Sequence, residues 1–274
     1  MVLYEVSEQN GRIMADAAPQ PREHHPQDAP MPDLFQVKAT ILCCEPPIWR
    51  RFLLPTDVCF DGLALAVLCS MAWSGEEPYY FRVEGEFIDD ELLAERDASP
   101  RLKGEVHLPA EKTPLADKVS EGDVFSMTYD LEDFWEIKID IERRLAGEEA
   151  PYPFMPVCID GARCAPFEGV GGPLGHADFC KIMADPHHPY HKSTVEWAAL
   201  PPGESYDPEY FTPFDVNEDY ALETMDACGD ELLPDDVDEL REMCRMLMAD
   251  KLASIANREL MISVRVRDAR DERG

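Results

Sequence analysis

The sequence predicts an α+β fold, in which a mixed β-sheet packs against helices and a helical extension follows at the C-terminus. Three observations lead to this class. Runs of alternating apolar and polar residues, typical of strands, occupy the first half of the chain. Apolar residues at helical spacing occupy much of the second half. With 274 residues, 45 % of them hydrophobic, the chain can bury one substantial core and carry appendages.

The first predicted elements form a strand pair followed by a helix. Residues 34–43 alternate between apolar and polar side chains, and prolines at 46 and 47 end this strand because proline donates no ladder hydrogen bond. A second strand is predicted over 48–54. Residues 60–72 carry apolar side chains at helical intervals, which indicates an amphipathic helix.

The later elements follow from the same two periodicities. Strands are predicted at 79–83, 124–130 and 134–141, the last two forming a hairpin with an acidic turn. Residues 89–118 are polar and mixed, and 151–173 form a long loop rich in Gly, Pro and Cys. The remaining predictions are helices at 174–184, 189–200, 215–225 and 235–257 and a closing strand at 260–266.

Composition divides the chain into three parts. Residues 1–33 are rich in Pro and Ala with little to bury, and we expect a flexible lead-in. Residues 34–220 form the α+β domain, and residues 221–274 form an acidic helical extension. The N-terminus lacks a basic start followed by an apolar stretch, so we expect a cytoplasmic protein rather than an exported one.

The charge and the cysteines limit the classes of partner and cofactor. Acids outnumber bases 56 to 25, a net charge of −31, and tight binding to duplex DNA or anionic lipid needs the opposite sign. We therefore expect no direct duplex DNA binding and no membrane association. Nine cysteines occur without a Cys-x-x-Cys pair, which favours reduced, packed thiols and predicts neither a metal site nor another cofactor.

Three blocks, in this order and spacing, resemble the plasmid pRiA4b ORF-3-like family. They are Glu45–Arg51 (EPPIWRR), Tyr129–Glu136 (YDLEDFWE) and Pro156–His176 (PVCIDGARCAPFEGVGGPLGH). The resemblance covers about residues 34–220. Members are often labelled passenger proteins of an insertion element, of a "TnpR" type.

The resemblance implies an α+β fold and an occurrence near plasmids and mobile elements, without an established biochemical activity. The "TnpR" label suggests a resolvase, which would need a nucleophilic serine within an arginine cluster and a basic DNA-binding module. The doublets at Arg50–Arg51 and Arg143–Arg144 stand isolated instead. The chain also departs from the family pattern at Leu131 and Glu132, where Phe and Gly are usual.

The first candidate site residues are Trp49, Arg50 and Arg51. One interpretation is a strand whose tryptophan lies in the core while an arginine pairs with a carboxylate. The other is an anion-binding groove, because the planar guanidinium group suits both tasks.

The hairpin contributes Asp133 and Trp135, with further carboxylates beside them. Such a cluster could hold a hard cation or supply a general acid and base. An ordinary acidic turn on an acidic protein is the alternative.

The loop after the hairpin contributes Asp160, Arg163, Glu168 and His176. Arg163 and Glu168 could pair, and the glycines before Pro173 could leave N–H groups open to an anion at a helix start. Cys158, Cys164 and His176 could form a zinc or Cys–His site. The interpretation we favour is a latch that docks the helical part on the sheet.

We predict that these nine residues converge on one surface of a non-catalytic binding or interaction module, associated with mobile elements, whose partner is a protein or a small ligand. The alternative is a metal-assisted or hydrolytic enzyme that uses the acidic hairpin and the Cys158–His176 loop. A third hypothesis is mimicry of DNA, which requires carboxylates in phosphate-like rows.

Overall fold

The computed structural model describes residues 33–90, 93, 106–146, 156–200, 205–213, 215–217 and 220, all within the unit Met31–Gly274. The strands are β1 (Leu34–Ile41), β2 (Ile48–Pro55), β3 (Tyr79–Val83), β4 (Glu86–Asp89), β5 (His107–Pro109), β6 (Val124–Tyr129), β7 (Trp135–Leu145) and β8 (Val157–Ala162). The helices are α1 (Phe60–Ser70), α3 (Gly172–Ala184) and α4 (His191–Trp197), with short 3-10 turns η2 (Ala110–Lys112) and η3 (Leu115–Asp117).

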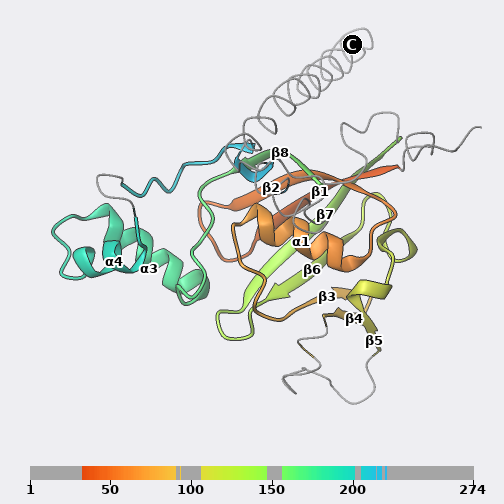
Figure 1. Ribbon diagram of the computed structural model, residues 1–274, viewed down its shortest axis with the longest axis horizontal. Helices are drawn as coiled ribbons and strands as arrows, with labels where there is room; N and C mark the ends of the chain where they lie inside the picture. The colour runs from red at the N-terminus through yellow and green to blue at the C-terminus, as the bar shows by residue number, and fades with distance from the viewer. Residues whose placement is uncertain are drawn as a thin grey trace, which may run out of the picture. The chain divides into compact units, whose positions relative to one another are not determined.

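The eight strands form one sheet in the order β5-β4-β3-β6-β7-β1-β2-β8 (Figure 1). β4 and β5 run parallel, and the other neighbours in this order run antiparallel. The sheet is therefore mixed, and the predicted α+β class is confirmed. The family resemblance implied a mixed sheet packed with helices, and the sheet order and strand directions confirm this as well.

The strand β1 lies between β2 and β7 and sets which side chains enter the core. Val37 stands opposite Phe52 on one side and Ile141 on the other, and all three side chains are buried. Because side chains alternate along a strand, this register sends one set of residues toward α1 and the next set to the opposite face.

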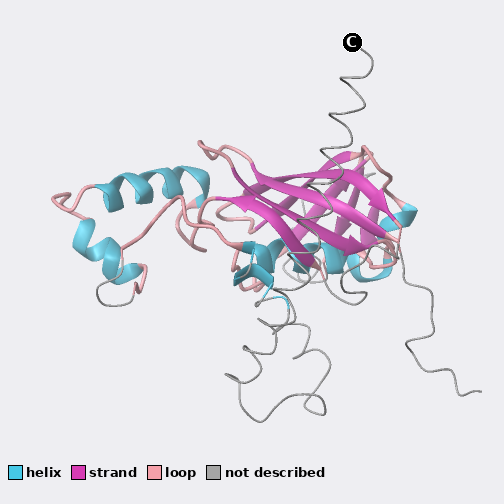
Figure 2. Cartoon of the chain, turned by 90° about the horizontal axis from the view of Figure 1, so that it is seen from above, coloured by secondary structure: helices cyan, strands magenta, loops and turns pink. Residues whose placement is uncertain are grey.

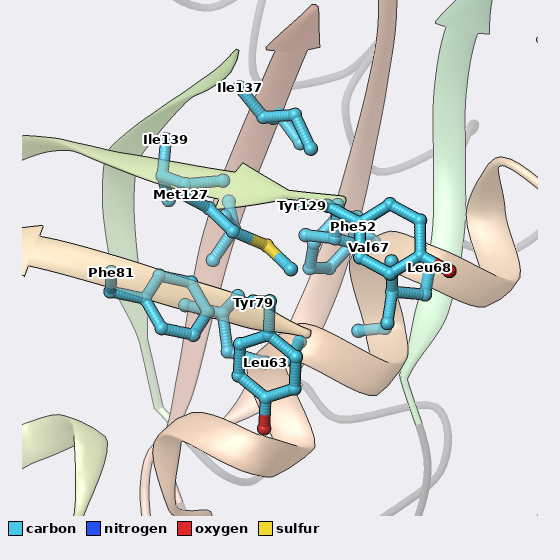
Figure 3. Packing of buried hydrophobic residues seen from close by; sticks show 14 of the residues in the cluster. Phe52, Leu63, Val67, Leu68, Tyr79, Phe81, Met127, Tyr129, Ile137 and Ile139 are labelled. Carbon is cyan, nitrogen blue, oxygen red and sulfur yellow. The ribbon is translucent and has the colours of Figure 1, made fainter. Parts of the chain in front are cut away.

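The helix α1 covers one face of the sheet, as Figures 1 and 2 show. Its residues Leu63, Val67 and Leu68 meet side chains from β6, β7 and their neighbours (Figure 3). Phe60 packs edge-on against Phe81 of β3 with ring centroids 5.1 Å apart. Burial of this apolar surface is the main term that holds α1 on the sheet.

The other face of the sheet is polar. Along β7, buried residues alternate with Glu136 and Lys138, which are exposed. In the part of the chain that the structure describes, the helix α1 therefore covers one face and leaves charged side chains on the opposite one.

Two sequence predictions are corrected. Residues 157–162 form the edge strand β8, although the stretch 151–173 was predicted as irregular, because Gly161 and its neighbours carry no alternation that reveals a strand. The polar stretch 89–118 contains β5 and two short turns. The predicted helix at 235–257, the strand at 260–266 and the extension 221–274 lie outside the described residues.

Among the described residues, no helix combines the length and the apolar character needed to cross a bilayer.

Candidate functional site

Arg50 and Arg51 of β2 point to opposite faces of the sheet. Arg50 is 3 % exposed and reaches the end of α1, whereas Arg51 is partly exposed and bonds to a carboxylate of β7. This follows from the two-residue period of a strand. The single surface predicted for both arginines is therefore divided by the sheet.

The Arg50 guanidinium is held by carbonyl groups. Its Nε donates to the carbonyl of Ser70 at 2.9 Å, and Nη1 donates to the carbonyls of Trp49 at 3.0 Å and Ala162 at 3.1 Å. The Phe211 ring lies 4.4 Å from its central carbon, in a cation–π contact. These contacts fix the position of the group, and none of them supplies a negative charge.

Within the described residues, no carboxylate pairs with Arg50 and no hydrogen bond involves its Nη2. Burial lowers the pKa of Arg50, although a guanidinium stays charged in proteins. A buried charge without a counter-ion is costly. The environment of Arg50 is therefore one that an anion would complete.

A cavity of about 460 Å³ adjoins Arg50. Met71 and Cys69 contribute from the end of α1, Ala165 to Glu168 from the loop after β8, and Phe211 and Val216 from the segment beyond α4. Apolar side chains thus form much of the wall around one buried cation. This combination is typical of small-molecule sites.

The described residues between 205 and 220 form one wall of the cavity, and two of their buried side chains anchor them to the domain. Asn217, 1 % exposed, accepts a hydrogen bond from the Cys158 N–H at 2.7 Å and donates to the Cys158 carbonyl at 2.8 Å. The hydroxyl of the buried Tyr220 donates to the Ala66 carbonyl at 2.6 Å. The side-chain amide of Asn217 therefore caps the edge strand β8 as a further strand would.

Gly161 of β8 is required by this arrangement. A Cβ atom at position 161 would collide with the ring of Phe211, which lies over Arg50. The absence of a side chain at one position thus lets an aromatic ring reach the guanidinium. Sequence reasoning missed Phe211 and Asn217, because nothing local marks a partner so far along the chain.

On the opposite face, Arg51 takes part in a complete ionic network. Nε and Nη2 donate to the two oxygens of Glu142 at 2.7 and 3.0 Å, and Nη1 donates to Asp160 at 2.9 Å. Gln36 also donates to Glu142 at 2.7 Å. Burial acts to raise the pKa of Glu142, but the bonds from Arg51 and Gln36 outweigh it and lower the pKa.

Trp49 lies beside this network on the same face. Its ring is flanked by Lys38 at 4.4 Å and by Arg51 at 4.9 Å. Trp49, Arg51 and Asp160 therefore form a group of their own, separate from Arg50.

Asp133 of the hairpin contacts the start of α3. Its Oδ2 accepts a hydrogen bond from the Gly171 N–H at 3.1 Å. Gly172 has φ +65°, and a Cβ there would collide with the Asp133 carbonyl. The N–H group of Gly171, which the sequence offered to an external anion, is thus engaged by a carboxylate of the chain itself. The neighbouring Asp130 also serves the turn, because it accepts from the N–H groups of Glu132 and Asp133.

Trp135 and Glu168 lie around a buried aromatic cluster. The Trp135 ring, 0 % exposed, lies 5.3 Å from Trp73, which stacks on Tyr129 at 5.3 Å. Glu168 accepts from the Tyr129 hydroxyl at 2.6 Å and from the Ser74 N–H at 2.9 Å. Trp73 donates to the Pro166 carbonyl at 2.9 Å, so this loop is tied to the sheet and to the end of α1.

Arg163 and His176 belong to another cluster. Arg163 pairs with Glu209 and not with Glu168, so that predicted pairing is wrong. The His176 Nε2 lies 3.6 Å from the Cys180 thiol one turn along α3, and its Nδ1 has no partner among the described residues. Burial, followed by the charge of Arg163, lowers the pKa of His176.

Cys158 lies in β8 and is bonded to Asn217, whereas His176 lies against Cys180, and no hydrogen bond among the described residues joins Cys158 to His176. Burial raises the pKa of Cys158 to about 12, which disfavours the thiolate that a nucleophile requires. Among the described residues, no group of three or more His, Cys, Asp or Glu side chains is placed to hold a metal ion.

The nine candidate residues thus separate into four groups. Arg50 and Glu168 border the cavity, and Trp135 packs in the aromatic cluster next to Glu168. Trp49, Arg51 and Asp160 occupy the open face, Asp133 braces the start of α3, and Arg163 and His176 lie in the remaining cluster.

The chain is similar to a known protein family and to two known proteins. A family model described as "Plasmid pRiA4b ORF-3-like protein" matches residues 33–215. The "Uncharacterized protein y4hQ" of Sinorhizobium fredii (strain NBRC 101917 / NGR234) is 30 % identical over 170 residues, which cover 60 % of this chain and 80 % of the relative. The crystal structure of the "Protein of Unknown Function MM3350" from Methanosarcina mazei Go1 is similar with a TM-score of 0.57 and 27 % identity, covering 68 % of this chain and 97 % of that one. The matched range 33–215 contains all nine candidate residues.

Proposed function

The chain belongs to the plasmid pRiA4b ORF-3-like family, and we propose that it is a non-catalytic binding module that holds a small ligand in the cavity beside Arg50. The observation that carries this proposal is the buried guanidinium, whose charge no carboxylate of the described residues matches. A protein tolerates such a charge at a cost to stability. An anionic ligand in the cavity would pair with this charge and offset the cost to stability.

The shape and lining of the site support a small ligand over a macromolecule. A volume of about 460 Å³ lies within the range of about 300–1,000 Å³ that small-molecule sites occupy. The net charge of −31 disfavours duplex DNA, because the phosphate backbone needs a cationic surface. Duplex DNA and membrane surfaces are therefore not part of the proposal.

The enzymatic alternative draws less support from the geometry. The hairpin carboxylates Asp130 and Asp133 hold the turn and the start of α3. Burial raises the pKa of Cys158 and of Cys164, the thiol on the cavity wall, and disfavours their nucleophilic forms. Stoichiometric zinc, magnesium or manganese in the purified protein would nevertheless favour the enzyme over the binding module.

Association with mobile elements forms a separate part of the proposal, and the plasmid in the family's description supports it. A survey of gene neighbourhoods tests it. We expect genes of close relatives to lie beside transposase or plasmid-maintenance genes more often than matched control genes do. An equal frequency would remove this part and leave the binding role intact.

The binding role is tested by blocking the cavity. Ala165→Phe places a ring in the cavity, and Ala177→Phe places the same ring on the exposed surface of α3 as a control. In ligand-observed NMR with a small-molecule library, we expect compounds that bind wild type and Ala177→Phe and lose binding to Ala165→Phe. If the library contains no such compound, or if Ala165→Phe binds as wild type does, the cavity is not the site.

A further inference from the structure

The number of open donors in the cavity limits what its ligand can be. Arg50 donates through Nε and Nη1 to three carbonyls, so in the described part of the chain only the two N–H bonds of Nη2 remain open. One nitrogen can satisfy one small anionic group. Phosphoryl groups carry more charge and are usually met by several donors. The open donors therefore favour a compact group with a single charge.

The charges on the cavity wall favour the same kind of ligand. Glu168 and Asp215 border the cavity, and each accepts a hydrogen bond from a tyrosine, Tyr129 and Tyr210 respectively. One guanidinium and two carboxylates border the cavity, so a second negative charge on the ligand adds repulsion that no second cation among the lining residues offsets. A monoanion bound to Arg50 can keep its charge at the guanidinium and its remaining atoms away from the acids.

The rest of the lining is suited to an apolar body. Met71, Pro166, Phe167, Phe211 and Val216 border the cavity together with Ala165. An organic group that displaces water from these side chains gains from the hydrophobic effect. A bare inorganic anion would leave most of this surface unused.

From these three constraints we infer that the ligand is a free monocarboxylic acid with an apolar aliphatic or aromatic body, its carboxylate bound to Nη2 of Arg50. This inference rests on the proposed binding role of the cavity. It adds the chemical class of the ligand and the direction in which that ligand enters, carboxylate first.

Matched ligands test the inference on the full-length chain. Isothermal titration calorimetry is carried out with aliphatic acids from butanoate to decanoate and with phenylacetate, each paired with its primary amide of nearly equal shape. We expect the best acid to bind at least about tenfold more tightly than its amide, a difference that one favourable charged contact readily supplies. Inorganic phosphate, at the concentration that saturates the acid, does not displace it.

Two variants connect the preference to its source. Arg50→Met is expected to bind acid and amide equally, whereas Arg51→Met, altered on the opposite face, keeps the preference of wild type. Circular dichroism reports whether each variant is folded. If Arg50→Met does not fold, the acid and amide affinities of wild type decide the question, together with loss of acid binding in Ala165→Phe.

The possible failures are distinguishable. Equal affinities of acid and amide for wild type would overturn the carboxylate assignment and keep the cavity as an apolar binding site. Displacement of the acid by phosphate would overturn the restriction to monoanions. If neither the acids nor the amides bind, and no compound of the NMR library does, the proposed binding function fails with the inference.

Discussion

Arg50 and Arg51 are neighbours in the chain and differ in almost every physical respect. Arg51 is partly exposed and makes charged bonds to Glu142 and Asp160. Arg50 is buried, and its partners in the described part of the chain are neutral carbonyls and an aromatic ring. One peptide bond thus separates an arginine that pairs with two carboxylates from one that pairs with no carboxylate of the described residues.

The contrast teaches how to distinguish a structural arginine from a binding one. The network around Arg51 is complete, so an external anion would have to compete with two carboxylates. Three carbonyl groups hold the Arg50 guanidinium in place, but no carboxylate of the described residues neutralises its charge. A cavity adjoins this group. The cost of a buried charge without a counter-ion follows from electrostatics alone.

The largest effect is expected from breaking the anchor on the Arg50 side. Asn217→Ala removes the side chain that bonds to the N–H and to the carbonyl of Cys158, and both of these hydrogen bonds are buried. Since each unsatisfied group costs about 1–3 kcal/mol, we expect a loss of about 2–4 kcal/mol in the free energy of unfolding. Urea denaturation measures it.

A surface change in the same segment is the control for this prediction. Tyr210→Phe removes a hydrogen bond to Asp215 from an exposed side chain, and we expect a change below about 0.5 kcal/mol. If the two variants were equally stable, Asn217 would not anchor the segment, and the wall of the cavity would be held by other contacts.

The second prediction compares the arginines directly. Arg51→Met removes charged bonds from a partly exposed network, and we expect the free energy of unfolding to fall by about 1–2 kcal/mol. Arg50→Met removes a buried charge that no carboxylate of the described residues pairs with, but it also removes the side-chain donor of three carbonyls. These effects oppose each other, so we expect a change within about 1 kcal/mol.

The order of the two variants is the decisive result, and thermal and urea denaturation at pH 7 both report it. A greater loss in Arg50→Met than in Arg51→Met would mean that the bonds to Ser70, Trp49 and Ala162 outweigh the cost of the charge. The guanidinium would then be a structural clamp, and the main support for a ligand would be gone.

Much of the fold could be predicted because its central elements carry their own periodicity. The alternation of apolar and polar residues in β1 and in the β6–β7 hairpin, and the helical spacing of α1, could be recognised in the sequence, and these elements are confirmed. The strand β8 was not legible. Its sequence VCIDGA is shaped by its pairing with β2, by Asn217 and by the ring over Gly161, and these are contacts across the fold.

The candidate site was predicted in its parts and not in its arrangement. The arginine doublet in a predicted strand already implied opposite faces, and this signal could have separated Arg50 from Arg51. No such signal exists for Phe211 or Asn217, which reach β2 and β8 from far along the chain. Likewise, local spacing suggested Glu168 for Arg163, whereas tertiary contacts bring Glu209 to it.

The third prediction sharpens the Arg51 side through its pH dependence. The pKa of Glu142 is lowered in the folded state, since the bonds from Arg51 and Gln36 outweigh the effect of burial. As the pH falls, Glu142 is therefore protonated at a higher pH in the unfolded chain than in the folded one. The stabilisation is present above the unfolded pKa of about 4.3 and is lost as pH falls through the lower folded-state pKa.

We expect the stability difference between wild type and Arg51→Met to be constant from pH 7 to about 5 and to shrink at lower pH. Glu142→Gln, which cannot ionise, is the matched control, and in that background Arg51→Met should show no such change with pH. A difference that persists unchanged at pH 3 would show that Arg51 stabilises the sheet by packing on Trp49 rather than by its ion pair.

The smallest effect on stability is expected from His176, which lies beside Cys180 and near Arg163, apart from Arg50 and Arg51. Burial and the charge of Arg163 lower its pKa, and its Nδ1 has no acceptor among the described residues. The unfolded chain binds a proton near pH 6.5 while the folded chain resists it, so stability falls as pH drops below that value. His176→Gln should flatten this part of the stability–pH curve, and His187→Gln, at an exposed position, is the control. If the stability of wild type and of both variants changed equally with pH between 6.5 and 5, the folded protein would accommodate a protonated His176, and the prediction would be wrong.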